Sequence, residues 1–458
     1  MAERAPHDDQ RVGRCVAHSQ SGNGGRDRSN DDAIRRDEDA TRAREDRRRE
    51  RERRRVDTAS APGRKSPSRP KGAAVTRGTS PRRTSGPNWK LVRRVAYAVI
   101  AVILVLEGVS FVRYVTKPSS SPFGVRTVEW VRANVSSSLV NEIERQYYSW
   151  TAPSTGGSTL TALPSVGLGT VNLNTIAASQ RPPRITPVIS PALPGEGVWR
   201  STGLTVAGAP AVLVTTFRSD PSYPRMVAGV AWIDQQQARV IYIPGRYEPA
   251  GAGPRGTMEV PMAARSQLLA TFNSGFRLED IHGGAYAYGT LFRPLVNGVA
   301  TAVGYKNGIT DVISWSGGPR PGSDVAYARQ NLPLIVENGR PNPNLNDSAQ
   351  WGVTLGNAIR VWRSGLGIDK YGNLIYAAAN QQTVGSLAQI LIHAGAVRAM
   401  ESDINYEWVS FITYAQPFGG LPTKLLSGID HGGSRYLVPD DRDFYAVIAR
   451  GPVTSRHG

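Results

Sequence analysis

The longest predominantly apolar stretch of the chain is Val95 to Val112. It carries a single charge, Glu107, and arginines flank it on both sides. A helix over this run is roughly 27 Å long at 1.5 Å of rise per residue, enough for the hydrocarbon core of a bilayer. The pattern therefore predicts one membrane-spanning helix over residues 95–115. A buried core helix and the apolar part of a cleaved signal peptide are the alternatives.

The next segment, residues 116–196, changes character halfway. Apolar positions recur at helical spacing from Phe123 to Trp150, which predicts one juxtamembrane helix. Residues 151–195 are rich in Pro, Gly, Ser and Thr and hold few charges. That composition is typical of a linker or of a loosely wrapped arm.

Short β-branched and apolar runs, each ended by turn residues, dominate residues 197–452 and predict strands. One hairpin turns at Asn307-Gly308, the strongest short-range hairpin signal. A second hairpin is predicted from Ile359 to Ala379, with its turn within 370–373. We expect one clear helix, Leu387–Ala394, capped by Ser386 and ended by Gly395. Many strands with few helices predict an α+β domain built on mixed β-sheet.

The remaining segment, residues 1–94, is polar and basic, with 26 Lys and Arg against 14 Asp and Glu. It has too little apolar surface to offset the entropy of ordering, so we expect a disordered tail. Basic charge beside a membrane helix stays in the cytoplasm. The pattern thus predicts a single-pass plasma-membrane protein with a cytoplasmic N-terminus and an extracytoplasmic C-terminal domain.

The charge of the tail has three interpretations. In the first, the tail is a solvated arm whose charge sets the membrane topology. In the second, the tail binds anionic lipid headgroups, and in the third it binds nucleic acid. The last is the weakest, because Trp89 is the only aromatic residue in the segment. We therefore expect no nucleic-acid partner.

Several chemistries are not supported by the sequence. The only cysteine is Cys15 in the tail, so the rest of the chain has no disulfide, thiolate metal site or cysteine nucleophile. There is no P-loop and no H-E-x-x-H motif. Asp430 and His431 are neighbours, and on a strand neighbours point to opposite faces, which makes them a poor metal pair. We predict neither a metal nor a cofactor.

A string of polar clusters, each beside a predicted strand end, carries the positive signal. The clusters are Phe272–Phe276, Arg329–Leu332, Trp362–Gly367 with Asp369, Glu401–Asn405, and Arg442–Phe444. In this order, over about residues 200–450, they resemble the phosphodiester glycosidase family.

Particular motifs carry the resemblance. Asn273-Ser274-Gly275-Phe276 resembles the family's Asn-Gly-Gly-Phe. The 367–372 stretch resembles its Gly-x-Asp-x-x-Gly hairpin. The predicted helix Leu387–Ala394 is followed by Gly395-Ala396, a strand and Asp403. This order resembles the family's helix, Gly-Ala, strand and Leu-Asp-Gly-Gly. The anchor with Arg126 and Glu129-Trp130 is similar to a membrane-anchored branch typical of actinobacteria.

The resemblance implies cleavage of glycosidic or sugar-1-phosphodiester bonds, here in cell-envelope glycans or glycophosphodiesters. Such a reaction needs a carboxylate for the sugar cation and arginine for the departing phosphate. The implied site residues are, as catalytic groups, Asp403, Asp369 and Glu401, and, as substrate-binding groups, Asn273, Arg329, Arg363 and Asn405. Asp403 is the first choice, because it directly follows a strand.

The departures from the family pattern keep an alternative open. Ser274 replaces a glycine, and two glycines are missing after Asp403. Glycines there would allow close backbone approach to a substrate. Their loss favours a non-catalytic module of the same fold that binds cell-wall polysaccharide. We expect a hydrolase to bring Asp403, Asn273 and Arg363 into one open pocket, and a binding module to leave them dispersed or buried.

Other site residues have structural interpretations. Asp369 is equally compatible with support of the hairpin turn. Arg442 and Asp443 are predicted to form a structural ion pair with each other rather than to act in the site. A buried Asp403 with an arginine partner is also compatible with a scaffold role.

Overall fold

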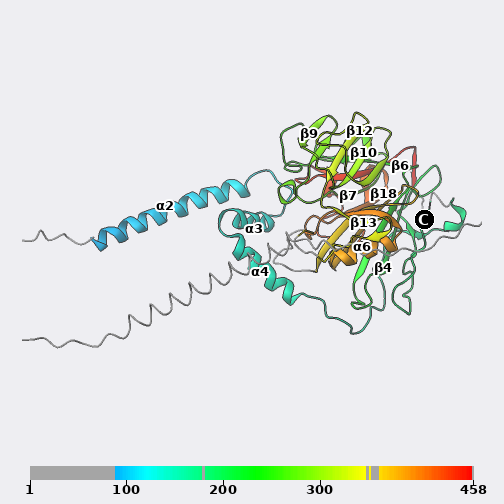
Figure 1. Ribbon diagram of the computed structural model, residues 1–458, viewed down its shortest axis with the longest axis horizontal. Coiled ribbons are helices and arrows are strands. Elements are labelled where there is room, and N and C mark those ends of the chain that lie inside the picture. The colour runs from blue at the N-terminus through cyan, green and yellow to red at the C-terminus, as the bar shows by residue number, and fades with distance from the viewer. Residues whose placement is uncertain (1–87, 178–180, 347–349, 352–359, 456–458) are drawn as a thin grey trace, which may run out of the picture. The chain divides into compact units, whose positions relative to one another are not determined.

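A computed structural model describes residues 88–177, 181–346, 350–351 and 360–455 (Figure 1). The predicted disordered tail lies almost entirely outside the described residues. The first described element is α2, Trp89–Val115, which contains the predicted span. It is the one helix in the described part of the chain that is long and apolar enough to cross a membrane, with a mean hydropathy of 2.4 and no buried residues. Its length and composition fit a single-pass anchor.

The predicted juxtamembrane helix is two helices, α3 (Phe123–Asn134) and α4 (Ser137–Trp150). The prediction of one continuous helix is wrong because Ser136 starts a new one: its extended backbone and its side-chain oxygen, which accepts from the Leu139 N–H, form an N-cap. Helix α3 packs on the end of α2. The Trp130 indole donates to Ser110 Oγ at 3.2 Å and meets the Phe111 ring edge-on.

Strands make up most of the regular structure in the remaining described residues. The largest sheet has nine strands in the order β1-β2-β4-β5-β16-β15-β17-β13-β14. Their bounds are β1 Gly169–Thr170, β2 Arg200–Ser201, β4 Val212–Arg218, β5 Val227–Ile233, β16 Leu374–Gln382, β15 Val361–Asp369, β17 Ala396–Glu401, β13 Leu334–Glu337 and β14 Arg340–Pro341.

Two five-stranded sheets and one strand pair complete the domain. One sheet is β11 (Thr310–Ser314), β10 (Ala300–Tyr305), β12 (Val325–Gln330), β8 (Ala285–Ala287) and β9 (Thr290–Arg293). The other is β19 (Gly420–Lys424), β18 (Phe411–Gln416), β7 (Leu268–Asn273), β20 (Phe444–Ala449) and β6 (Ala238–Ile243). The pair is β21 (Val453–Ser455) and β3 (Leu204–Val206).

Helices are few and short in this part. They are α5 (Met262–Arg265), α6 (Val384–His393) and the 3-10 turns η1 (Leu173–Thr175), η3 (Leu278–Asp280), η5 (Pro417–Gly419) and η6 (Arg435–Leu437). The predicted α+β class, with few helices after one long apolar helix, is confirmed, and the strand pairs within the described residues are antiparallel.

The nine-stranded sheet is buried on both faces. Along β5, Ala231 and Ile233 join the core shared with the two five-stranded sheets, whereas Val230 and Trp232 join the core beneath α6. Successive side chains on a strand point to opposite faces, so a strand covered on both sides is apolar throughout. In Figure 1, α6 lies beside β13 of this sheet. A site residue on one of these strands can therefore contact only groups on its own side of the sheet.

The predicted hairpins and helix are present. The Asn307-Gly308 turn joins β10 and β11, with Gly308 at φ +84°, and a turn at 370–373 joins β15 and β16. The first predicted residue of the second hairpin, Ile359, lies outside the described residues. Helix α6 begins one turn earlier than expected, because its N-cap is Thr383. Ser386 is the third helical residue and completes a capping box with Thr383.

The Pro- and Gly-rich segment 151–195 contacts the strands that follow it. The Arg218 guanidinium donates to the carbonyls of Ile189 and Pro191, and the Trp199 indole donates to the Pro183 carbonyl at 2.9 Å. Of the two interpretations, the wrapped arm agrees with these bonds. The boundary between residues 196 and 197 stays a prediction.

Candidate active site

Asp403 sits in the loop that follows β17 and pairs with Arg442. Arg442 Nη2 donates to Asp403 Oδ2 at 2.9 Å and to the Gly275 carbonyl at 2.7 Å. The Asn405 N–H donates to Asp403 Oδ1, so both carboxylate oxygens are engaged. The predicted pair between Arg442 and its neighbour Asp443 is wrong, because each turns to a different partner.

The Asp403–Arg442 pair is almost completely shielded from solvent. The Asp403 and Arg442 side chains are 5% and 9% exposed. Burial raises the pKa of Asp403, and the Arg442 charge counteracts the rise. The Arg442 guanidinium lies over the Trp408 ring, 4.7 Å from its centroid. The pair is therefore a preorganised carboxylate and guanidinium in a low-dielectric environment.

Asn273 reaches Asp403 through one hydroxyl. Its amide nitrogen donates to Ser364 Oγ at 3.1 Å, and the same Oγ accepts from the Asp403 N–H at 3.1 Å. Its carbonyl oxygen accepts from the Tyr376 hydroxyl and the Ser410 N–H. These bonds commit Asn273 to holding the loop around Asp403. Its proposed contact with a sugar hydroxyl has no support from this geometry.

Arg363 and Glu401 form a second buried ion pair, on the other face of the sheet. In the β15–β17 ladder Glu401 lies opposite Gly365, and Arg363 shares the face of Gly365. A Cβ added to Gly365 would meet Leu391 and Leu387, so this face is the α6 side. Burial raises the pKa of Glu401. The expected meeting of Arg363 with Asp403 is wrong, because the sheet separates them.

Arg329 belongs to a third buried pair. Its Nε donates to Asp443 Oδ2 at 2.6 Å, and the same oxygen accepts from the Tyr242 hydroxyl at 2.6 Å and from Ser274 Oγ at 3.1 Å. Burial alone would raise the pKa of Asp443, but the Arg329 charge holds it below its usual range. Ser274, the residue that replaces a family glycine, is therefore part of this network.

Asp369 is bound within the hairpin turn between β15 and β16. Its Oδ1 accepts from the N–H groups of Tyr371 and Asn373, and its Oδ2 accepts from the Trp232 indole at 3.0 Å. These contacts fit the structural interpretation given for Asp369. We leave it out of the proposed machinery.

The sequence reasoning missed Trp408 and Arg435, which lie near Asp403 and Arg442. Trp408 is flanked by two arginines, Arg442 and Arg435, the latter 5.3 Å from the ring centroid. Arg435 also donates to Asp440 Oδ2 at 3.0 Å. The available signal was the 440–443 stretch, which holds four consecutive charged residues directly before an apolar strand.

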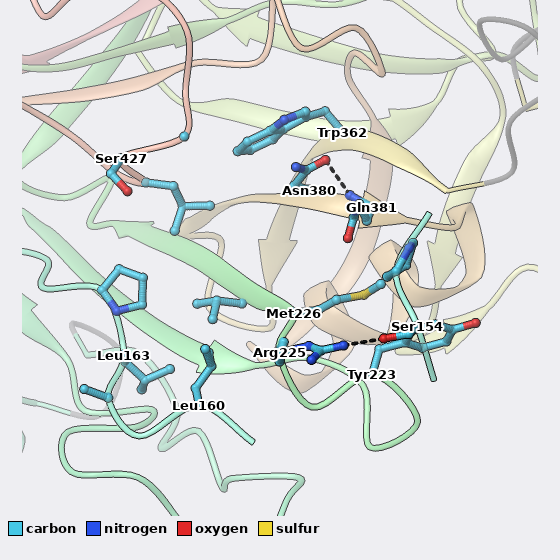
Figure 2. A pocket seen from close by; sticks show the side chains of 16 residues that line it. Ser154, Leu160, Leu163, Tyr223, Arg225, Met226, Trp362, Asn380, Gln381 and Ser427 are labelled. Carbon is cyan, nitrogen blue, oxygen red and sulfur yellow. Dashed lines mark hydrogen bonds between the residues drawn. The ribbon is translucent and has the colours of Figure 1, made fainter. Parts of the chain in front are cut away.

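A separate cleft of about 500 Å³ lies between the 151–195 arm and the strands (Figure 2). Figure 2 shows Trp362 above the amides of Asn380 and Gln381, with Leu160 and Leu163 across from them. The lining residues include no Asp, Glu or His among the described part of the chain. An aromatic ring beside amides suits a sugar ligand, but without a carboxylate this cleft has no group for glycoside hydrolysis.

Two lining residues of the cleft stand out in their conformation and contacts. Gln381 has φ +57°, a conformation that a non-glycine residue rarely adopts. Arg225, which also lines the cleft, hydrogen-bonds Ser154 of the arm. The arm thus forms one wall of the cleft, and the strained strand end forms another.

Comparisons with known proteins add only fold likeness. No family model matches the chain, and no curated protein matches it. Among solved structures, it is similar to the zebrafish N-acetylglucosamine-1-phosphodiester α-N-acetylglucosaminidase catalytic domain auto-inhibited by its pro-peptide. The identity is 16% and the TM-score 0.36, over 54% of this chain and 87% of that one.

Two further structures show weaker likeness. A hypothetical protein from Synechocystis has 12% identity and a TM-score of 0.34, over 57% of this chain and 64% of that one. A putative exported protein from Burkholderia pseudomallei has 11% identity and a TM-score of 0.27, over 51% and 75%. We therefore base the functional proposal on the residues of the site.

Proposed function

We propose that residues 197–452 form a membrane-anchored, extracytoplasmic hydrolase that cleaves sugar-1-phosphodiester or glycosidic bonds of cell-envelope glycans. One observation carries this proposal: Arg442 Nη2 lies 2.9 Å from Asp403 Oδ2, in the loops before β20 and after β17, although the open pocket expected of a hydrolase around Asp403, Asn273 and Arg363 is not formed. They are the two charges that the reaction needs at one place. The family-like order of motifs in the sequence supports the same reaction.

Each group has a defined task in this reaction. A water oxygen bonds to the anomeric carbon as the bond from that carbon to the phosphate oxygen breaks, and the bonding electrons leave with the phosphate monoester. Asp403 either accepts the proton of this water, or it attacks first: its oxygen then bonds to the anomeric carbon as the phosphate leaves, and water displaces it in a second step. Arg442 gives up its hydrogen bond to Asp403 and binds the anionic phosphate instead. Burial raises the pKa of Asp403 above that of an ordinary carboxyl, which makes its carboxylate a better proton acceptor.

The test uses the full chain in detergent and a panel of methyl diesters of sugar-1-phosphates in both anomeric forms. We expect Asp403→Asn and Arg442→Gln each to lower kcat/KM by about a hundredfold. Glu337→Gln, which changes an exposed carboxylate, is the matched control. Equal turnover by wild type and Asp403→Asn would refute the role of Asp403.

A second candidate, a non-catalytic module that binds cell-wall polysaccharide, is favoured by two observations. Asp403, Asn273 and Arg363 are buried and do not share an open pocket. The 500 Å³ cleft offers Trp362 and two amides but no carboxylate. Titration with envelope polysaccharide fragments tests it: Trp362→Ala should abolish binding, whereas Phe418→Ala, at an exposed aromatic residue elsewhere, should not. Unchanged binding by Trp362→Ala would reject the module.

A further inference from the structure

Three potential metal ligands meet beside the candidate active site. They are Glu407, in the loop between β17 and β18, and Asp430 and His431, in the loop between β19 and η6. Their ligand atoms all lie within 4.8 Å of one another. Asp430 and His431 lie outside any strand, so the expectation that they point apart does not apply. The loop turns both side chains toward Glu407.

Two of these ligand atoms are buried without a hydrogen-bond partner among the described residues. They are Glu407 Oε2 and His431 Nε2, which lie 3.9 Å apart. The Glu407 side chain is 6% exposed and that of His431 is 13% exposed. A buried carboxylate oxygen with no partner is costly, and native proteins seldom leave one unsatisfied. A cation between the two atoms would satisfy both.

The local charge balance fits a divalent ion. The Arg435 guanidinium lies close by, donating to the Glu407 carbonyl at 3.1 Å, and its charge is paired with Asp440 at 3.0 Å. The Arg435 guanidinium is also held over the rings of Trp408 and Tyr436. The carboxylates of Glu407 and Asp430 therefore contribute two negative charges that no other described residue neutralises by an ion pair with Lys or Arg.

We propose that Glu407, Asp430 and His431 bind a divalent transition-metal ion, for which zinc is the best match. One imidazole nitrogen with two carboxylate oxygens suits zinc better than calcium or magnesium, which take oxygen ligands. Ligand atoms on a tetrahedral zinc ion lie roughly 3.3 Å apart, so Glu407 and His431 need only a small approach.

Three protein ligands leave the fourth zinc position for a water molecule or a substrate oxygen. The site adjoins the Asp403–Arg442 pair through Trp408. The ring of His431 is 6.2 Å from the Trp408 ring, and the Arg442 guanidinium lies 4.7 Å from the centroid of the same Trp408 ring. The site goes beyond the proposed reaction, which needs no metal, and its test measures binding rather than turnover.

The experiment dialyses chelator-treated full-length protein in detergent against Zn²⁺ and measures bound metal by mass spectrometry. We expect one Zn²⁺ per chain, and Co²⁺ in its place should give the visible absorption of a four-coordinate site. Glu407→Gln and His431→Gln should each weaken binding by at least about tenfold. His282→Gln, at an exposed histidine in another loop, should bind like wild type.

Thermal unfolding provides the second measurement. Zn²⁺ should raise the Tm of wild type and His282→Gln and leave that of Glu407→Gln unchanged. Asp430 is exposed, so Asp430→Asn keeps the fold and repeats the comparison if a buried variant unfolds. The proposal is overturned if wild type binds no stoichiometric Zn²⁺, or if Asp430→Asn and Glu407→Gln bind it as tightly as wild type.

Discussion

Arg363 and Asp403 lie on opposite faces of the nine-stranded sheet, although the loop that carries Asp403 runs beside β15. Asp403 is bonded to Ser364, which directly follows Arg363 on β15. Because neighbours on a strand point to opposite faces, Arg363 reaches the α6 side and pairs there with Glu401. The phosphate-binding role expected of Arg363 passes to Arg442, and the Arg363–Glu401 pair belongs to the scaffold.

The Arg363–Glu401 pair predicts a strongly non-additive stability cycle. Arg363→Met leaves the Glu401 charge buried and unpaired, which should cost about 3–5 kcal/mol of unfolding free energy. Adding Glu401→Leu removes that charge and should recover more than half of the loss. Chemical denaturation followed by tryptophan fluorescence measures both variants.

The matched control is the Arg398–Asp311 pair, whose side chains are 36% and 26% exposed. Arg398→Met should cost no more than about 1 kcal/mol. If Arg363→Met lowered the unfolding free energy as little as this surface variant, the buried Glu401 charge would not need Arg363 to stabilise it. Hydrolysis by the double variant should match wild type, since neither side chain faces Asp403.

Asp443 predicts a defined response to acid. Its folded pKa lies below the ordinary value of 3.8 because of Arg329, which outweighs burial. A carboxyl with a depressed folded pKa stabilises the protein above its unfolded pKa and loses that contribution as pH falls. The Tm difference between wild type and Asp443→Asn should therefore stay constant from about pH 8 to about pH 5 and narrow below about pH 4.

This prediction has a clear opposite. A difference that widens on acidification would mean that the folded pKa of Asp443 is raised rather than lowered. Asp311→Asn, at the partly exposed pair, should show little Tm change at any pH in this range.

Local sequence signals identified the elements of this fold well. Asn307-Gly308 specified a hairpin because a turn with positive φ admits few other residues. Gly395, at φ +101°, ended α6 where expected. The break at Ser136 was missed because helical spacing of apolar residues continues across it, while the serine cap acts on the backbone.

The site was less predictable because it depends on which face each residue occupies. Asp403 and Arg442 are 39 residues apart, and no local pattern shows that the chain folds one onto the other. Arg442-Asp443 looked like a pair, yet neighbours in an extended chain diverge. Glu407 carries no signal at all until the loop with His431 is folded against it.

The cap of α6 offers a direct test of which residue begins the helix. Thr383→Ala should lower stability by about 1 kcal/mol, because Thr383 Oγ1 accepts from the Ser386 N–H. Ser386→Ala should lower it by a similar or smaller amount, because Ser386 Oγ accepts from the Thr383 N–H. Thr423→Ala, on the exposed edge strand β19, is the control. A loss of stability in Ser386→Ala but not in Thr383→Ala would identify Ser386 as the N-cap of α6.

The single cysteine makes the orientation of α2 testable with little engineering. Cys15 precedes the helix and lies outside the described residues, and the rest of the chain has no cysteine. With a cytoplasmic N-terminus, a membrane-impermeant maleimide should label Cys15 only after the cells are permeabilised. In a Cys15→Ser, Thr423→Cys variant, the exposed position on β19 should be labelled in intact cells. Labelling of Cys15 in intact cells would reverse the proposed topology, and a shortened protein without Cys15 would identify α2 as part of a cleaved signal peptide.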